Sequence, residues 1–249
     1  MLHVEHLCKS FGGTVALDDV GIVVGPGESV GLVGPNGAGK TTLFECVAGT
    51  VRPDAGTVRF AGRDLGTMAP WRRARLGMSR TYQRVEVFPE LTVRDHLLVA
   101  DRACHRQPRL WRDLLGLAAP RPAEVARVDA VLELVGLGTV ADIPVAALGL
   151  GTCRLVELAR AIMCEPRLLL ADEPSSGLDE HETAELAQVL RALQRERSLA
   201  LVVVEHDLAM VEAVVDRVVV MDLGKVIATG TFPTVMAATQ VRRAYLGAS

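Results

Sequence analysis

The chain has 249 residues, of which 49% are hydrophobic and 23% charged, and its formal net charge is −3. This composition excludes a disordered chain, and the small net charge offers no whole-chain argument for binding nucleic acid or an anionic membrane. No apolar run is long enough to cross a membrane, the N-terminus lacks a signal-peptide core, and five cysteines without a C-x-x-C pair predict reduced thiols in a cytosolic compartment.

The N-terminal part of the chain alternates short apolar runs with glycine-containing turns. This pattern is typical of β-strands, because turn residues bound each run and the runs are too short for helices. Strands are predicted at residues 2–7, 20–24, 29–33 and 57–60.

A glycine-rich loop follows the predicted strand at residues 29–33. Residues 34–42 read GPNGAGKTT and match the P-loop pattern G-x-x-x-x-G-K-[ST], with a helix predicted from Thr41. In such a loop, successive backbone N–H groups point inward and bind phosphate at a helix N-terminus. We therefore expect a nucleoside triphosphate site, in which Lys40 contacts the β- and γ-phosphates and Thr41 ligates Mg²⁺. The loop residues expected to bind the nucleotide are Gly34, Pro35, Asn36, Gly37, Ala38, Gly39, Lys40, Thr41 and Thr42.

A predicted helical segment interrupts the strands. Thr92 and Asp95 form a predicted capping box, and apolar residues keep helical spacing over residues 122–135. We expect residues 88–154 to be a helical subdomain inserted within a single domain that spans residues 1–249.

Strand character returns in the second half of the chain. Residues 168–171 and 199–204 are predicted strands with a helix between them, and residues 217–221 and 225–228 predict a hairpin. Alternating strands and helices imply an α/β fold with a mainly parallel sheet that is covered on both faces. Because phosphate sites in such sheets lie at the carboxyl ends of strands, we expect the polar residues after these strands to meet the P-loop on one edge.

Two acids follow the predicted strand at residues 168–171. Asp172 is placed to hold Mg²⁺ through water, and Glu173 is the candidate general base that polarises a water in line with the γ-phosphate. The alternative is a solvated acidic turn after a core strand, which the upstream P-loop disfavours.

Three further side chains are candidates, each with a structural alternative. Gln83 could reach Mg²⁺ or the attacking water, although a lone glutamine is usually a surface residue. His206 follows a predicted strand and could contact the γ-phosphate or orient Glu173, although a single histidine is usually structural. Phe11 could stack on a purine or be a core phenylalanine.

Together with residues 176–179 (SGLD) and 205–207 (EHD), these motifs resemble the ATP-binding subunits of ABC transporters over nearly the whole chain. The family's motifs occur in order: aromatic loop (Phe11), Walker A (34–42), Q-loop (Gln83), signature (148–152), Walker B (168–172) with Glu173, D-loop (176–179) and H-loop (His206). The resemblance implies an ABC-type P-loop (RecA-like) fold with an antiparallel β part and a helical subdomain. It also implies ATP and Mg²⁺ as cofactors and ATP hydrolysis as the activity.

Within that family, the chain is most similar to subunits that power uptake of branched-chain amino acids and similar small polar solutes. The features that carry this similarity are RTYQ at residues 80–83, VFPELTV at 87–93, the long insert to Leu137 and AYLG at 244–247. The resemblance implies a peripheral subunit at the cytoplasmic face of the cell membrane. Its implied partners are a second ATP-binding subunit, two integral-membrane permease subunits and, indirectly, a solute-binding protein, with no nucleic acid.

Two alternatives belong to other functional classes. A soluble ABC-type ATPase acting on nucleic acid or ribosomes usually has coiled-coil inserts or tandem cassettes, and this chain shows neither, nor a basic cluster. A binding-only regulatory module would explain an altered signature, but Lys40, Asp172, Glu173 and His206 are all retained.

The signature departs from the family's Leu-Ser-Gly-Gly-Gln. Residues 148–152 read LGLGT, so Gly149 replaces the serine. In ABC dimers this motif caps the ATP held by the other subunit's P-loop, and we expect Gly149 and Gly151 to contact that nucleotide through their backbones. Because a hydrogen bond to a charged phosphate contributes ~1.5–3 kcal/mol, its loss predicts an asymmetric pair of sites in a hetero-dimer.

Overall fold

The computed structural model describes residues 1–81, 87–105 and 120–246 of the chain. Its central element is a six-stranded sheet in the order β10-β9-β3-β8-β7-β6, in which all neighbours are parallel except β10 and β9. The predicted α/β class is therefore confirmed. The strands are β3 (Ser29–Val33), β6 (Met78–Arg80), β7 (Leu168–Asp172), β8 (Ala200–Val204), β9 (Arg217–Asp222) and β10 (Lys225–Gly230).

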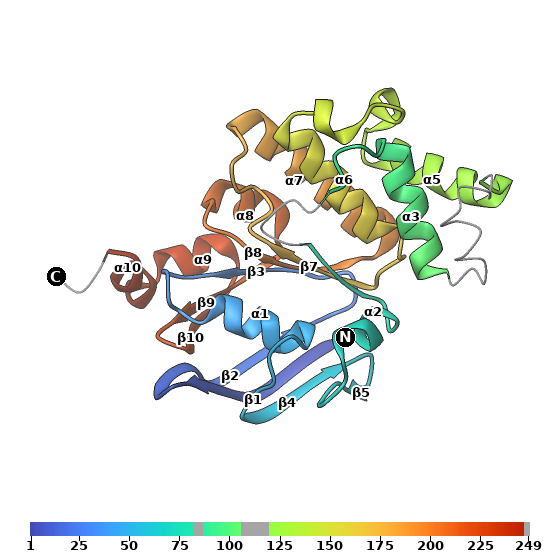
Figure 1. The fold of residues 1–249 in the computed structure, drawn as a ribbon. Helices are drawn as coiled ribbons and strands as arrows, with labels where there is room; N and C mark the ends of the chain where they lie inside the picture. The colour runs from blue at the N-terminus through green and yellow to red at the C-terminus, as the bar shows by residue number, and fades with distance from the viewer. Residues whose placement is uncertain (82–86, 106–119, 247–249) are drawn as a thin grey trace.

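A second, antiparallel sheet has four strands in the order β2-β1-β4-β5. Helix α1 (Lys40–Ala48) lies between the two sheets (Figure 1). The N-terminal strands are longer than predicted because Gly12 and Gly13 both have positive φ and close a tight hairpin between β1 and β2. The strands are β1 (Leu2–Phe11), β2 (Thr14–Val24), β4 (Ala55–Phe60) and β5 (Arg63–Asp64).

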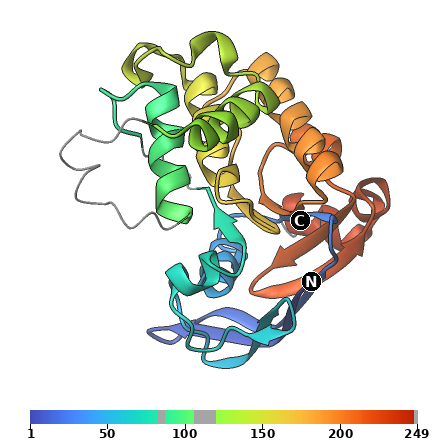
Figure 2. The ribbon, with the colours of Figure 1, turned by 90° about the vertical axis from the view of Figure 1, so that its right-hand side faces the viewer.

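Larger helices cover the other face of the six-stranded sheet. In Figure 2 the green, yellow and orange helices gather on the side opposite the blue antiparallel sheet. In the described part of the chain, no helix has the length and apolarity needed to cross a membrane. The remaining helices of the described residues are α2 (Pro70–Ala74), α3 (Val93–Cys104), α5 (Pro122–Leu134), η1 (Gly138–Val140), η2 (Val145–Ala147), α6 (Leu150–Ile162), α7 (Glu180–Arg197), α8 (Leu208–Val214), α9 (Phe232–Ala237) and α10 (Thr239–Leu246).

Local signals account for where several helices begin. The Thr92 hydroxyl accepts a hydrogen bond from the Asp95 N–H at the start of α3. Asp179 and Glu182 form a reciprocal capping box at the start of α7. Each cap satisfies backbone N–H groups that the first turn of a helix leaves without partners.

The core consists of two apolar clusters, one on each face of the six-stranded sheet. Along β7, Leu168 and Leu170 belong to the cluster that includes α1 residues, whereas Leu169 and Ala171 belong to the cluster under the large helices. This alternation makes β7 apolar at successive positions, which is typical of a parallel strand buried on both faces.

The cysteine pattern led to a wrong prediction. The structure contains a disulfide between Cys104, at the end of α3, and Cys164, two residues beyond α6. These residues are 60 positions apart, and they meet because α3 and α6 pack against one another. The spacing of cysteines in the sequence does not reveal such a tertiary contact.

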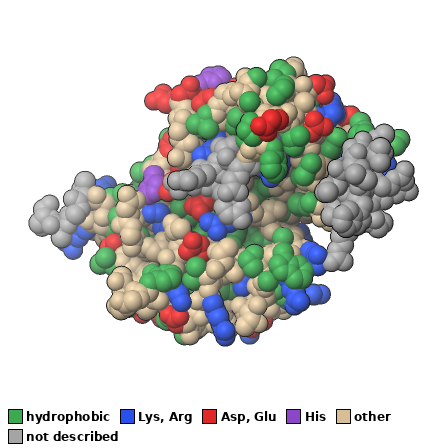
Figure 3. Space-filling model, in the orientation of Figure 1, with side chains coloured by type: hydrophobic (Ala, Val, Ile, Leu, Met, Phe, Trp, Pro, Cys, Tyr) green, Lys and Arg blue, Asp and Glu red, His purple; other side chains and the backbone are tan. Residues whose placement is uncertain are grey.

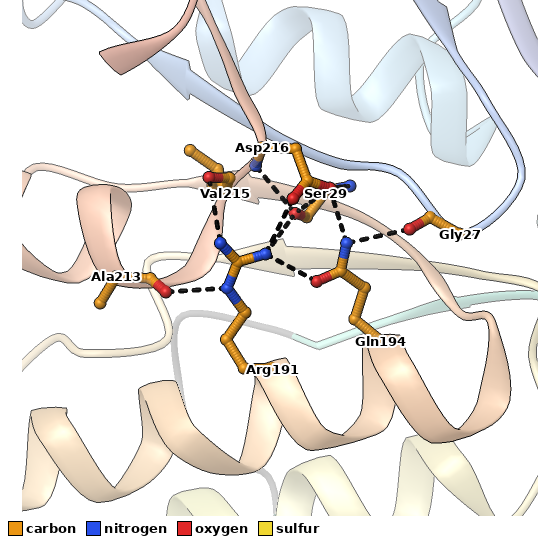
Figure 4. Close-up of polar contacts among 7 residues, drawn as sticks. All are labelled: Gly27, Ser29, Arg191, Gln194, Ala213, Val215 and Asp216. Carbon is orange, nitrogen blue, oxygen red and sulfur yellow. Dashed lines mark hydrogen bonds and ion pairs between the residues drawn. The ribbon is translucent and has the colours of Figure 1, made fainter. Parts of the chain in front are cut away.

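A polar cluster ties α7 to the amino ends of β3 and β9 (Figure 4). One oxygen of Asp216 accepts hydrogen bonds from the Ser29 N–H at 2.9 Å, the Ser29 hydroxyl at 2.8 Å and the Gln194 amide at 2.6 Å. Its other oxygen accepts from the Arg191 guanidinium at 2.9 Å. The cluster therefore fixes the amino-terminal ends of β3 and β9, at the opposite end of the strands from the P-loop.

The pKa of Asp216 should make this cluster sensitive to acid. Burial raises the pKa of this carboxyl, but hydrogen bonds from Ser29, Arg191 and Gln194 outweigh burial and lower it below the usual value. The carboxylate thus stabilises the fold above its unfolded pKa of about 3.9, and that contribution is lost as the pH falls through the folded pKa.

We expect Asp216→Asn to lower the free energy of unfolding by about 1–2 kcal/mol at pH 7, a figure reduced for partial exposure. The difference from the unmodified chain should shrink as the pH is lowered below 4. Urea denaturation at both pH values measures this, with Glu133→Gln, at an exposed position, as the control. A constant difference at both pH values would contradict the assigned ionisation.

Candidate active site

The P-loop joins β3 to α1 and presents an uncapped helix N-terminus. Gly39 is the N-cap of α1 without a side-chain hydrogen bond, and the first turn contains no acid. The Lys40 ammonium turns back and donates to the carbonyls of Gly34 at 2.6 Å and Pro35 at 3.0 Å. Burial lowers the pKa of Lys40, and the negative charge of Glu173 offsets part of this decrease. Free N–H groups, a helix dipole and a buried cation suit an anion such as phosphate.

Two P-loop glycines are required by packing against the protein itself. A Cβ on Gly34, where φ is 149°, would lie 2.1 Å from the Met221 carbonyl oxygen. A Cβ on Gly39, where φ is 97°, would lie 2.4 Å from the Ala16 carbonyl oxygen. Gly37 has a positive φ of 81° but faces open space. The loop is thus clamped between β9 and β2.

The other predicted residues of the loop divide by exposure. Asn36 and Thr41 are exposed, Thr42 is half-buried, and Ala38 is buried. The Ala38 carbonyl accepts from the Gly224 N–H at 3.1 Å, in the turn between β9 and β10. The Thr41 hydroxyl, in the first turn of α1, is therefore accessible to a ligand at the loop.

Phe11 ends β1 and is not part of the core. Its side chain is 48% exposed, which excludes the core alternative. The Lys9 ammonium lies 5.1 Å from the centre of its ring, a cation–π contact. An exposed ring face remains compatible with the predicted stacking on a purine.

The ends of β7 and β8 bring the predicted base and histidine together. Glu173 Oε1 lies 3.1 Å from His206 Nε2. The Glu173 backbone has a φ of 47°, in the left-handed region, and its N–H donates to the Val204 carbonyl at 2.8 Å. Such a conformation is costly for a residue with a side chain and is concentrated at functional sites. The predicted meeting of strand ends on one edge is confirmed for these two residues.

Asp172 is buried and already has a cationic partner. The Arg80 guanidinium, at the end of β6, donates to Asp172 Oδ2 at 2.8 Å. Within the described ranges, no group of three His, Cys, Asp or Glu side chains could hold a metal by itself. A single carboxylate, that of Asp172, fits Mg²⁺. This ion usually binds one or two protein carboxylates and fills its other positions with water and phosphate oxygens. Gln83 lies outside the described residues.

Charged side chains of both signs gather around this edge. On the face shown in Figure 3, acidic, basic and histidine side chains lie close together on the left of centre, between the helical half and the lower half. Such a mixture of charge is expected where one site must hold both an anion and its counter-ions.

Glu205 was missed as a site residue by the sequence reasoning. It is buried, and its Oε1 accepts from the Ser175 N–H at 2.8 Å. Its Oε2 accepts from the N–H of His206 at 3.0 Å and lies 3.4 Å from that of Asp207. Glu205 thus fixes the backbone on either side of the Glu173–His206 pair. The available signal was an acid placed directly after an apolar strand, where its charge needs several donors.

The altered signature lies at the N-terminus of α6. Gly149 is its N-cap without a side-chain hydrogen bond, and a Cβ there would meet no atom within 4 Å. The Gly151 N–H donates to Glu182 Oε1 at 3.3 Å, and a Cβ on Gly151 would lie 2.6 Å from that oxygen. Glu182 also caps α7, so it joins the signature to the helix after the D-loop segment.

Comparison with known proteins places this geometry among relatives. The ABC transporter family model matches residues 17–176. The chain is 36% identical over 252 residues to the high-affinity branched-chain amino acid transport ATP-binding protein LivG of Escherichia coli (strain K12), covering 99% of this chain and 98% of LivG. It is 34% identical over 250 residues to BraF, of the same description, from Pseudomonas aeruginosa, again covering 99% and 98%. The structure of MJ1267 in its ADP conformation, an ATP-binding cassette of an ABC transporter, has a TM-score of 0.87 and 29% identity over 99% of this chain and 98% of that chain.

Proposed function

Because this chain belongs to the ABC transporter family of ATP-binding proteins, we propose that it hydrolyses ATP to power uptake of branched-chain amino acids or similar small polar solutes. The observation that carries the proposal is the meeting of three elements on one sheet edge. The P-loop follows β3, Glu173 follows β7, and His206 follows β8, and these three strands are parallel neighbours.

In this site, each residue is assigned a role from its position. Lys40 leaves the loop carbonyls and binds the β- and γ-phosphates, while the first turn of α1 binds phosphate through its N–H groups. Thr41 and Asp172 would hold Mg²⁺, which supplies charge neutralisation on the phosphates when bound. Gln83 is assigned to the same metal or to the attacking water. Phe11 stacks on the base, and Gly149 and Gly151 contact a nucleotide held by a partner subunit.

Glu173 acts as the general base in the proposed reaction. Its carboxylate accepts the proton of a water whose oxygen bonds to the γ-phosphorus, while the bond from that phosphorus to the bridging oxygen breaks and ADP leaves. His206 contacts that carboxylate at 3.1 Å and, because it follows the carboxyl end of β8, is also assigned a contact with the γ-phosphate. Glu205 positions His206 by binding its backbone N–H at 3.0 Å.

The proposed partners are a second ATP-binding subunit, two integral-membrane permease subunits and, indirectly, a solute-binding protein, at the cytoplasmic face of the cell membrane. Residues 88–154 would serve as the helical subdomain that contacts the permeases. A groove of about 430 Å³ supports this assignment, because Ala100, Ala103 and Cys104 of this segment line it together with residues of α2 and of the later part of α6. Trp71, which is 52% exposed, lies at this groove.

We assign the second ATP-binding subunit to a hetero-dimer with unequal sites. Gly149 offers no hydroxyl to a nucleotide on the partner, and a serine would fit there because the space is open. Lys40, Asp172 and Glu173 are all present in this chain, and the site that they build would rely on the partner's signature to cap its nucleotide.

Purification of the tagged chain from native membranes in mild detergent tests the function. We expect mass spectrometry to identify two multi-span proteins and a second ATPase whose signature contains the serine. The recovered complex is then reconstituted in vesicles with its binding protein. It should transport labelled leucine only when ATP is present on the side of the membrane that carries this subunit. Recovery without membrane proteins, or with ribosomes or DNA-repair factors, would overturn the transport assignment.

A further inference from the structure

Arg80 occupies a position that the proposed chemistry leaves unexplained. Its guanidinium lies 2.8 Å from Asp172 Oδ2, and its side chain is 14% exposed. The same guanidinium lies 5.8 Å from the centre of the Phe44 ring in α1, the helix that begins at the P-loop. The ion pair therefore joins β6, β7 and α1 beneath the site.

We propose that Arg80 is a counter-ion that holds Asp172 in the metal-free state and competes with Mg²⁺ for this carboxylate. The inference rests on the proposed function, because it takes Asp172 as the partner of Mg²⁺. A buried carboxylate without a counter-ion is costly, so some cation must face Asp172 before metal arrives. A guanidinium and a divalent cation beside one carboxylate repel each other, so arrival of the metal weakens the Arg80 contact.

The exchange can occur through the side chain alone. The Arg80 backbone is held in the sheet. Arg80 is paired with Leu170 where β6 lies beside β7, and the N–H of Thr81 donates to the Leu170 carbonyl at 2.9 Å. The arginine stem has several rotatable bonds, so the guanidinium can leave Asp172 without any change of strand pairing.

Release of Arg80 alters the groove assigned to the membrane subunits. Arg80 and Trp71 both line this groove. Among its described lining residues the one acid is Glu157, which is itself paired with Arg154 at 3.3 Å. Once Mg²⁺ binds Asp172, this carboxylate no longer neutralises the guanidinium, and the groove becomes more positive. Binding of the metal at the nucleotide would in this way change the charge of the groove without any movement of the helices that cover the sheet.

The metal dependence of nucleotide affinity tests the competition directly. The probe is a fluorescent, non-hydrolysable ATP analogue, and its Kd is measured with Mg²⁺ and with EDTA for the unmodified chain and for Arg80→Gln. We expect the strengthening of binding by Mg²⁺ to be about tenfold greater in Arg80→Gln, a typical size for coupling between two sites. An unchanged ratio would mean that Arg80 is merely structural, and weaker binding both with and without Mg²⁺ would mean that it contacts phosphate; either result overturns the proposal.

Two control variants separate charge from position. Arg160→Gln removes a positive charge from the same groove, on α6, and should leave the ratio unchanged. Arg80→Lys keeps a cation at the end of β6 and should return the ratio toward that of the unmodified chain. If the unmodified chain fails to bind the analogue under any condition, the proposed function fails instead, so the two failures are distinguishable.

Trp71 gives a second readout at the groove. The chain has two tryptophans, so Trp111→Phe leaves Trp71 as the single indole reporter. We expect the analogue with Mg²⁺ to change the Trp71 emission, whereas the analogue with EDTA does not, and Arg80→Gln should abolish this difference. Emission that responds equally with Mg²⁺ and EDTA would overturn the link to the groove.

Discussion

Replacement of Glu173 by glutamine is expected to lower ATP hydrolysis by about 10²–10⁴-fold while ATP binding persists. In the unmodified chain Glu173 lies 3.1 Å from His206. Glutamine has the same size and can keep this hydrogen bond, but it cannot accept a proton from water. The unusual backbone at this position, with a φ of 47°, costs glutamine as much as glutamate, so the fold should be unaffected.

Phosphate release by the assembled complex and the Kd of a fluorescent ATP analogue measure the two parts of this expectation. Glu185→Gln is the matched control. Glu185 is an exposed acid on α7 that, like Glu173, lies beside a histidine: its carboxylate is 3.6 Å from His181 Nδ1. Turnover above about a hundredth of the unmodified rate would exclude Glu173 as the base, since a general base typically contributes about 10²–10⁴-fold.

Replacement of Gly34 by alanine is expected to destabilise the nucleotide-free fold by about 3–5 kcal/mol, the sum of backbone strain and overpacking. The added Cβ would lie 2.1 Å from the Met221 carbonyl oxygen, which belongs to β9 and cannot rotate away. The backbone φ of 149° is also one that residues with side chains rarely adopt.

Gly37→Ala separates the collision from the backbone strain. Gly37 lies in the same loop with a φ of 81°, but an added Cβ would meet no atom within 4 Å. Only the left-handed backbone then contributes, about 1–2 kcal/mol. Urea denaturation of both variants without nucleotide gives the comparison, and equal losses of stability would show that the contact with Met221 relaxes freely.

The parts of the site that a contiguous pattern encodes could be predicted from the sequence. The P-loop is specified within nine residues, 34–42, and the acids and histidine follow apolar runs that could be recognised as strands. Parallel strands place their carboxyl ends together, so the approach of Glu173 and His206 followed from topology. The β1–β2 hairpin and the cap of α7 were equally local, since the pair Gly12-Gly13 marks the first and Asp179 with Glu182 marks the second.

Contacts between distant residues could not be predicted in the same way. Arg80 and Asp172 are separated by 92 positions, and their ion pair depends on the pairing of β6 with β7. The three-residue strand β6 (Met78–Arg80) has too little apolar pattern to be recognised alone. The disulfide between Cys104 and Cys164 likewise depends on the packing of α3 against α6. One sequence without tertiary information leaves such partners undetermined.

The clamped P-loop has a thermodynamic consequence for ligand capture. Its glycines pack against carbonyls of Ala16 and Met221, and its Ala38 carbonyl is bonded by Gly224, so both sheets hold the loop in shape. Ordering a flexible backbone costs about 1–2 kcal/mol per residue, and here that entropy is lost during folding rather than at binding. The loop backbone is therefore preorganised and little of its entropy is lost at binding, so the rearrangement left for phosphate capture is that of the Lys40 side chain, which must leave the Gly34 and Pro35 carbonyls.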